Sequence, residues 1–592
     1  MSARPGRTAR ARWLRWGLLA LVVVVVGAFI GYTGYQAVRA KQALHEVAAD
    51  FQMLRGQLAS GDTAGAAQTV RAAQHDSARA RDLTRGPGWW LAGKLPGVGA
   101  DVYAVRTAAD VTYQLSSNVL PDVVRAARVL RPDRLRPRHG RIHVAPIRAV
   151  APTVVSADRA LHAQAARVLA IDTGNLAGQI AGPISTLQAK LADAVALADH
   201  ASLAVRLLPQ MLGAKGPRTY LFMFQNNAEA RATGGIAGSI ALVTADHGKL
   251  SLGEQGGAAT IGHFDRPVLP LTHAEKRLFG ARLAEYPQDV NLTPNFPRSA
   301  ELIAAMWSAR HQRKVDGVVS ADPVALSYLL AGTGPVHLDG GHPLTASNAV
   351  SLLLNRVYFQ IADPRQQNPF FNSVARKVFE ALTAGRGRPR GILHGLTKAA
   401  DEHRLLVWST RPAEQGLLAP TAISGELPTQ PTGAPQVGVY LDDASGAKMD
   451  YYLHYRVDMA STGCRAGRQQ LRLTLRMRSA VPADTRRLPD YIVAPAVHGP
   501  RGTFLTTVYF YLPAGGRLRS LAIDGQPQPF SVARHDGRPV MAQTVTLAPG
   551  ERHTLVAAMV GGAGQRGAPL LRTTPGANGT GAGQVTPSAC DR

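Results

Sequence analysis

The sequence is poor in cysteine and in negative charge, and each shortage excludes a class of protein. Two cysteines are too few for a metal cluster. The 18 histidines lack ligand spacing, and no cysteine protease pair, zinc motif or Gly-x-Ser-x-Gly elbow occurs. With 40 acidic against 66 basic residues, the formal net charge is +26. A cationic body favours anionic partners, although GC-rich coding and solubility would produce the same excess.

Charge is also missing from one long stretch near the N-terminus. No charged residue stands between Arg15 and Arg39, and no acidic residue precedes Glu46. A bilayer core of ~30 Å needs about 20 apolar helical residues, which residues 16–36 supply. The arginines of residues 1–15 predict a basic cytoplasmic tail. The sequence thus predicts a single-pass plasma-membrane protein whose bulk lies outside the cell.

The alternative for this segment is a cleaved signal peptide. Its apolar run would be ~7–15 residues long and would end at a small-residue cleavage site. No such site is evident, so the uncleaved anchor is the interpretation that the residues favour. An outward-facing body disfavours nucleic acid as a partner, and no nucleic-acid motif is present. Membrane lipid, polyprenyl phosphate or an anionic envelope polymer remain as partners.

The chain after the predicted span is expected to be multidomain, since ~100–200 residues form a typical domain. Residues 37–210 are predicted to be an extracytoplasmic α-helical stalk. Their first helix carries one apolar stripe with helical spacing, formed by Leu44, Val47, Phe51, Leu54 and Leu58. Asp62 is a plausible N-cap for the next helix. Trp89 and Trp90 follow a break and would lie at the lipid interface or in the core.

Two further domains are predicted beyond the stalk. Residues 217–410 alternate strands with helices, which indicates an α/β domain, and Asp246-His-Gly248 is typical of a hairpin turn. Residues 435–560 hold regularly spaced short strands, typical of an immunoglobulin-like β-sandwich. Residues 561–592 are rich in Gly, Pro and Thr and are predicted to be a flexible tail.

The densest polar cluster lies in residues 226–238 (NNAEARATGGIAG). Glycine lets backbone amides approach an anion, and arginine offers a planar fork to phosphate oxygens. The run lacks the Gly-Lys-Ser/Thr ending of a P-loop. A tight strand connection with a capping asparagine is the alternative. The candidate ligand residues here are Asn226, Asn227, Glu229, Arg231, Thr233, Gly234 and Gly235.

Two further clusters would add to a phosphate site. Asn291 and Arg298 flank the start of a predicted helix, where anions are attracted, although an Asx turn with helix capping explains them equally. A third cluster combines two arginines with a carboxylate and would make a pyrophosphate pocket if folding joined it to the glycine-rich loop. Its members are Arg356, Asp363, Arg365 and Gln366.

The two cysteines, Cys464 and Cys590, would either remain free thiols or form one disulfide. An oxidising compartment favours the disulfide. It would hold the tail against the body near Cys464.

Several motifs together resemble the bacterial family called domain of unknown function 4012. They are residues 226–238, DVN at 289–291 with NFP at 295–297, DGVVSADP at 316–323 and GTGPV at 332–336. The preceding membrane helix, the helical stalk and the C-terminal β region are also similar to that family. The resemblance implies no activity.

A more distant resemblance links this chain to the LytR-CpsA-Psr family, through residues 315–336, 344–350, 355–356 and 363–367. Members are membrane-anchored phosphotransferases that use arginines and Mg²⁺ to attach polyprenyl-pyrophosphate-linked glycopolymers to cell wall. By motif position, the resemblance gives Arg231, Arg356 and Arg365 catalytic roles. The family's metal-binding Asp is replaced by Gly234, and Glu229 or Asp265 would have to supply its carboxylate.

Two functions are therefore expected. The first is binding or transfer of a polyprenyl-pyrophosphate-linked glycopolymer at a LytR-CpsA-Psr-like central domain, with the three arginines stabilising the transferred phosphoryl group. The second is a non-catalytic envelope scaffold or binding module. Only the first function requires Arg231, Arg356 and Arg365 to line one cavity, so a structure would distinguish the two.

Overall fold

The computed structural model describes residues 7–339, 343–429, 432–493, 496 and 499–590, and for residues 7–30, 59, 132 and 364 it describes the backbone alone. The chain divides into two compact units. The helical unit comprises Met1–Leu135 and His143–Gln210. The mixed unit comprises Arg136–Ile142 and Met211–Arg592.

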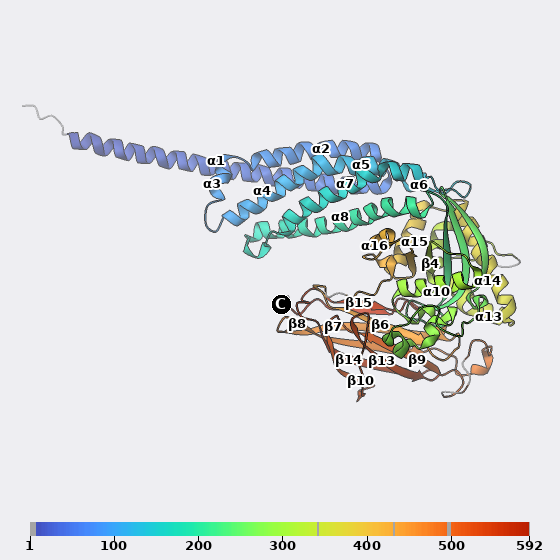
Figure 1. Cartoon of the computed structure of the whole chain (residues 1–592). Coiled ribbons are helices and arrows are strands. Elements are labelled where there is room, and N and C mark those ends of the chain that lie inside the picture. The colour runs from blue at the N-terminus through green and yellow to red at the C-terminus, as the bar shows by residue number, and fades with distance from the viewer. Residues whose placement is uncertain (1–6, 340–342, 430–431, 494–495, 497–498, 591–592) are drawn as a thin grey trace, which may run out of the picture. The chain divides into compact units, whose positions relative to one another are not determined.

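Long helices lying side by side make up the helical unit (Figure 1). The polar side chain of Asp62 caps the second helix by accepting a 2.9 Å hydrogen bond from the Gly65 amide, as predicted. Trp89 is buried, whereas Trp90 is 58% exposed. The helices are α1 (Arg7–Ser60), α2 (Thr63–Leu83), α3 (Pro87–Ala92), α4 (Gly99–Gln114), the π-helical turn η1 (Leu115–Val119), α5 (Leu120–Val129), α6 (Pro132–Leu135), α7 (Val144–Leu169), the 3₁₀ turn η2 (Thr173–Asn175) and α8 (Gly178–Met211).

The predicted anchor of residues 16–36 lies on α1, which is one unbroken helix at the backbone level. Among the described residues, no helix has the length and apolarity needed to cross a membrane. The side chains of residues 16–30, most of the predicted span, lie outside the described set, so the span stays a prediction.

A five-stranded sheet in the order β3-β2-β1-β4-β5 forms the α/β part of the mixed unit. β1 pairs in parallel with β4, and the other neighbours are antiparallel. The strands are β1 (Arg218–Asn226), β2 (Ile236–Asp246), β3 (Lys249–Gly257), β4 (Gly317–Ala321) and β5 (Leu405–Ser409). The two-residue turn from β2 to β3 has positive φ at His247 and Gly248, which matches the hairpin predicted there.

Helices surround this sheet and complete the α/β part. Asp322 caps the helix after β4 through a 2.7 Å hydrogen bond from the Ala325 amide. The helices and helical turns of the α/β part are η3 (Ala258–Ile261), α9 (His273–Phe279), η4 (Ala281–Ala284), η5 (Pro287–Leu292), α10 (Phe296–His311), α11 (Pro323–Thr333), α12 (Ala349–Ser351), the π-helical turn η6 (Leu352–Arg356), α13 (Val357–Gln360), α14 (Pro364–Thr383), α15 (Pro389–Asp401), α16 (Pro412–Leu418) and η7 (Ala422–Ser424).

Two more sheets follow, and their inward residues form one core. One sheet has the order β11-β10-β14-β8-β7-β16 and the other β12-β13-β9-β6-β15. Leu473, Phe510 and Leu555, from both sheets, belong to the same buried cluster. The elements are β6 (Gln436–Asp443), η8 (Asp450–Tyr452), β7 (Leu453–Arg465), β8 (Arg468–Ser479), η9 (Thr485–Arg487), β9 (Phe504–Tyr511), β10 (Arg517–Ile523), β11 (Gln526–Pro527), β12 (Ala533–His535), β13 (Arg538–Leu547), β14 (Arg552–Val560), β15 (Leu570–Thr573) and β16 (Ala582–Val585). The immunoglobulin-like connectivity stays a prediction.

The prediction of a flexible tail over residues 561–592 is wrong. β15 pairs in parallel with β6, and β16 pairs in parallel with β7. Thr574, just after β15, is fully buried. Cys464 and Cys590 form a disulfide that fixes the end of this tail to the body. The Gly- and Pro-rich composition describes the isolated segment, whereas its order comes from strands more than a hundred residues earlier in the chain.

Candidate functional site

The glycine-rich loop connects β1 to β2 and is buried inside the mixed unit. Ala228 and Asn227 are 0% and 1% exposed. A Cβ on Gly235 would lie 2.3 Å from the carbonyl carbon and oxygen of Asn226, so the chain passes too close to itself there for any side chain. Gly234 adopts φ 139°, a conformation that glycine favours. These glycines therefore allow the backbone at Gly235 to pass directly against the backbone at Asn226.

The amides of this loop do bind carboxyl oxygens, but these belong to aspartates of the chain itself. The Ala230 amide donates to Asp450 Oδ2 and the Ala232 amide donates to Asp442 Oδ1, each at 2.8 Å. The Asp443 amide donates in return to the Ala230 carbonyl at 2.9 Å. The loop thus uses its anion-binding backbone to attach the α/β part to the C-terminal sheets.

Arg231 is an interior cation, with 4% of its surface exposed. Its Nη2 donates to Asp289 Oδ1 at 3.1 Å, and its Nη1 donates to the Ala230 and Asp443 carbonyls at 3.0 and 3.2 Å. Burial lowers its pKa, but the carboxylates, Asp289 first, outweigh burial and leave the pKa raised. The prediction that Arg231 is an accessible phosphate ligand therefore needs correction, because the side chain is buried and both Nη atoms bind groups of the chain itself, although its Nε is buried without a hydrogen bond.

Negative charge exceeds positive charge around Arg231. Burial raises the pKa of Asp442 and of Asp450 well above the ordinary value for aspartate, and the further oxygen of each, Oδ2 and Oδ1 respectively, is buried without a hydrogen bond. Lys448 adds a second buried cation by pairing with Glu229. A raised carboxyl pKa means that a proton is held more readily, which reduces the unbalanced charge.

A second branch of the same network ties the loop to the C-terminal tail. Asn227 Nδ2 donates to Asp322 Oδ2 at 3.0 Å and to the Pro575 carbonyl at 2.9 Å. Arg404, 1% exposed, donates to Asp322 Oδ2 at 2.6 Å and to the Gly576 carbonyl at 3.0 Å. We call the whole network the central polar cluster; its members are Asn227, Glu229, Arg231, Asp289, Asp322, Arg404, Asp442, Asp443, Lys448 and Asp450.

The remaining predicted residues near the loop also have internal partners. Asn226 donates to the Tyr358 hydroxyl at 2.6 Å, and Asn291 donates to the Gly235 carbonyl at 2.9 Å. Arg298 donates to Glu275 at 2.7 Å rather than lying free at the start of α10. The Thr233 hydroxyl is buried with no hydrogen bond. Most of these side chains therefore secure the loop and the segments packed on it.

The third predicted cluster lies on the surface. Arg356 and Gln366 are exposed, and the Arg365 side chain is 96% exposed. Asp363 caps α14, since its Oδ1 accepts from the Arg365 amide at 3.0 Å. Folding does bring the segment around Arg356 to the loop, since Leu354 packs with Ala228 and Tyr358 accepts from Asn226, but no hydrogen bond or ion pair of the described residues joins Arg356 or Arg365 to buried Arg231. The prediction that folding unites these arginines around one phosphate-sized hollow is thus corrected.

One family model matches part of the chain. Residues 215–358 match the family described as protein of unknown function (DUF4012). The recognition of this family from its motifs is confirmed. No curated protein and no solved structure matches the chain. The DUF4012 region runs from just before β1 to α13, so it includes the glycine-rich loop, Arg231 and Arg356.

Magnesium does not fit the carboxylates expected to hold it in the DUF4012 region. Glu229 is neutralised by Lys448, and the Asp265 side chain is 99% exposed beside His263. In the part of the chain that the structure describes, only Asp158, His162 and Asp199 of the helical unit lie close enough together to share an ion. These residues are partly or fully exposed, and they are not in the DUF4012 region.

Sequence reasoning missed the aspartates that meet the DUF4012 loop. Asp442 and Asp450 lie 210 and 220 residues away from their loop partners. One local signal was available: Asp442, Asp443 and Asp450 are three acidic residues within nine positions at the end of a predicted apolar strand. Arg404, another missed member, carries no local signal that distinguishes it from surface arginines.

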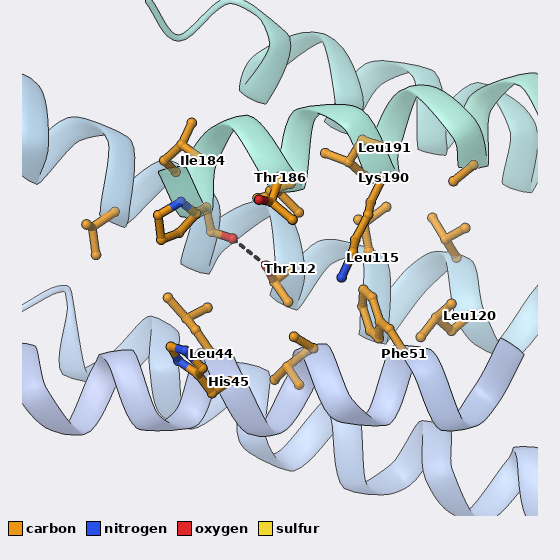
Figure 2. A pocket seen from close by; sticks show the side chains of 18 of the residues that line it. Leu44, His45, Phe51, Thr112, Leu115, Leu120, Ile184, Thr186, Lys190 and Leu191 are labelled. Atoms are coloured by element: carbon orange, nitrogen blue, oxygen red, sulfur yellow. Dashed lines mark hydrogen bonds between the residues drawn. The ribbon is translucent and has the colours of Figure 1, made fainter. Parts of the chain in front are cut away.

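A different candidate site lies outside the DUF4012 region, within the helical unit. A cavity of about 2230 Å³ opens between α8 and the helices α1, α4 and α5. In Figure 2, Phe51, Leu115 and Leu191 surround the space, and Lys190 extends from α8 toward Phe51 and Leu115. The predicted apolar stripe of α1 lines it along its whole length, through Leu44, Val47, Phe51, Leu54 and Leu58. The lining is mostly aliphatic, so the site suits an apolar ligand.

Proposed function

We propose that this chain is a membrane-anchored, outward-facing protein of the cell envelope that binds a ligand or partner without catalysing transfer. The observation that carries the non-catalytic part is the internal engagement of the DUF4012 loop, whose amides donate to Asp442 and Asp450. Phosphoryl transfer depends on donors and cations aimed at the transferred group. Arg231, the cation expected there, is instead held by Asp289.

Three further features support the anchored, extracytoplasmic placement. Residues 16–36 have the length and composition of a span and continue into the stalk on α1 without a break. The Cys464–Cys590 disulfide suits an oxidising compartment. A net charge of +26 suits anionic lipid or envelope polymer as a partner.

A topology reporter tests the placement. Fusing a periplasm-active phosphatase to the C-terminus of the full chain should give outside activity, whereas a fluorescent reporter that folds only in the cytosol should stay dark. Deleting residues 16–36 should release the chain from the membrane fraction. A bright cytosolic reporter at the C-terminus would overturn the proposal.

A second candidate function is phosphoryl transfer of a lipid-linked glycopolymer, with a LytR-CpsA-Psr-like central domain. The observation that favours it is the π-helical turn η6, which ends at exposed Arg356, because such turns are frequent at functional sites. Purified full-length protein would be incubated with a polyprenyl-pyrophosphate-linked saccharide and Mg²⁺. We expect no release of polyprenyl phosphate. Release that is lost in the Arg356→Ala/Arg365→Ala double variant would favour transfer over binding.

A further inference from the structure

We infer that α3 and the turn after it form a second contact with the membrane, in which Trp90 and Leu95 enter the head-group region of the bilayer beside the predicted span. We call residues 87–98 the α3 segment. The contact fixes the depth at which the helical unit stands on the membrane surface. It deepens the proposed function and rests on the anchor of residues 16–36, and it uses no residue of the DUF4012 region.

The short helix α3 has one buried side and one exposed side. It begins at Pro87, because proline is tolerated at the first helical position, and Gly88 and Trp89 are buried. Trp90 and Leu91, the next two residues, are exposed. The sequence left the core and the lipid interface open for both tryptophans. The structure separates them, with Trp89 in the interior of the helical unit and Trp90 on its surface.

Large apolar side chains gather on the exposed side of the α3 segment. Trp90, Leu91, Leu95 and Val98 are each between 44 and 58% exposed. Among the described residues of the helical unit, the buried apolar clusters contain none of these four side chains. Single exposed apolar residues are ordinary on a protein surface. Four of them within nine consecutive residues mark an interaction surface.

Contacts with α1 place the α3 segment where the predicted span ends. Gly88 lies so close to the Thr33 side chain that a Cβ on Gly88 would overlap with it, and a Cβ on Gly86 would touch the Gln36 side chain. Thr33 and Gln36 belong to the last turn of the predicted span. In Figure 1 the N-terminal part of α1 extends beyond the other helices, and α3 lies near the point where α1 joins them. With residues 16–36 in the bilayer, the α3 segment lies at the membrane surface.

The side chains at this level have the chemistry of a bilayer interface, where tryptophan and tyrosine are enriched. Tyr35 of α1 and Trp90 are both 58% exposed. The Lys94 ammonium lies 4.0 Å from the centre of the Trp90 ring, and the Arg39 guanidinium lies 5.7 Å from that of Tyr35. Long basic side chains at this depth reach the head-group phosphates. Residues 83–100 contain no acidic residue, so no negative charge of this stretch repels those phosphates.

Position and charge together select lipid over a protein partner. A protein-binding patch needs no fixed relation to the span, whereas an interfacial patch has to lie at the depth where the span leaves the hydrocarbon. Interfacial segments combine tryptophan or leucine with basic residues and enter the bilayer by about 5–10 Å. Trp90, Leu95 and Lys94 meet both conditions.

Nitroxide labels on the full-length protein, in vesicles of phosphatidylcholine and phosphatidylglycerol, test the inference. The labels are attached in Leu95→Cys and, as the matched control, in Leu208→Cys; the native cysteines are held in the disulfide. Leu208 is also exposed, by 42%. It lies about 45 Å along α8 from the start of that helix, at about 1.5 Å per residue. The start of α8 is close to the α3 segment, because Asp101 accepts from the Ala177 amide at 2.9 Å.

We expect the label at position 95 to collide severalfold more with O₂, which dissolves in lipid, than with a water-soluble nickel chelate. The label at position 208 should show the reverse. Adding Trp90→Gln should shift the label at position 95 toward the nickel chelate without changing thermal unfolding, whereas Trp90→Phe, which keeps an apolar ring, should leave it in place.

A label at position 95 that favours the nickel chelate would overturn the inference. A label shielded from both reagents would overturn it as well, because a protein contact would then cover the α3 segment. Membrane retention and the topology reporter are measured on the same variants. A water-exposed label on a chain that stays in the membrane with its C-terminus outside rejects this contact and leaves the anchor standing.

Discussion

The DUF4012 loop and the apolar stripe of α1 show opposite relations between sequence pattern and structure. The loop is polar and glycine-rich, and its groups are mostly satisfied by the chain itself through Asp289, Asp442 and Asp450. The stripe has the pattern of an ordinary packed helix, yet much of it borders an open cavity. Polar composition alone thus does not distinguish a ligand site from a structural contact. The comparison depends on whether the polar groups of the loop and the apolar groups of the stripe are covered by the chain itself.

The largest effect should come from removing Arg231, the buried cation where the DUF4012 loop meets the C-terminal sheets. Arg231→Leu removes the buried cation among Asp289, Asp442 and Asp443 and leaves Asp289 only its 2.7 Å pair with the partly exposed Arg282, so we expect a loss of about 3–5 kcal/mol in unfolding free energy. Chemical denaturation of the full chain measures it. Arg365→Ala, at a 96% exposed side chain, should stay within ~0.5 kcal/mol of wild type. Equal stability of the two variants would mean that the loop is not a structural joint.

A backbone test follows, with two glycine substitutions of opposite sign. Gly235→Ala places a Cβ 2.3 Å from the Asn226 carbonyl group and should cost about 2–3 kcal/mol. Gly416→Ala, within α16 and with open space around its Cβ, should add about 0.4–1 kcal/mol. Thermal unfolding measures both. A Gly235→Ala protein as stable as wild type would contradict the tight crossing described for the loop.

The pH dependence of stability probes the excess negative charge. Burial raises the pKa of Asp450 in the folded state, so the folded protein binds this proton more tightly than the unfolded chain. Its contribution to stability is present below the ordinary aspartate pKa of ~3.9 and is lost as pH rises toward the raised folded value, by at most ~1.4 kcal/mol per pH unit. Asp450→Asn, which keeps an acceptor for the Ala230 amide, should flatten this decline. A parallel pH profile for variant and wild type would show that Asp450 is ionised throughout.

The smallest effect is expected in the helical unit. Leu197, 71% exposed on α8, lines the cavity, whereas Leu208, 42% exposed on the same helix, does not. Both Leu197→Gln and Leu208→Gln should change unfolding free energy by less than ~0.5 kcal/mol. A large loss for Leu197→Gln alone would mean that the cavity is closed in solution and is part of the packed core.

Local patterns predicted local structure well. The Asp62 cap, the His247–Gly248 turn and the start of the sheet near residue 217 each depend on a few neighbouring residues, and each is present. The tail was mispredicted because β15 and β16 are ordered by pairing with β6 and β7. Composition indicates how flexible a segment is in isolation, but it does not show which strands the segment pairs with in the fold.

The site was harder to predict than the fold for the same reason. The amides of residues 226–238 do bind carboxyl oxygens, as glycine and amide chemistry indicates, but which residues supply those oxygens depends on contacts over 210 residues or more. The cavity was missed because the spacing of Leu44, Phe51 and Leu58 specifies an apolar face and does not say how closely α8 approaches it. Both errors concern distant packing, which a single sequence does not encode in its local spacing.

The contact between Thr574 and the DUF4012 loop sets the order in which this part of the fold can be completed. The Thr574 hydroxyl donates to the Ala232 carbonyl across 342 residues, and Asn227 and Arg404 meet Pro575 and Gly576 beside it. The network around the loop therefore stays incomplete until almost the last residues have been synthesised. A chain stopped after β14 would leave charged groups uncovered, which makes it a substrate for quality-control proteases rather than a shorter working protein.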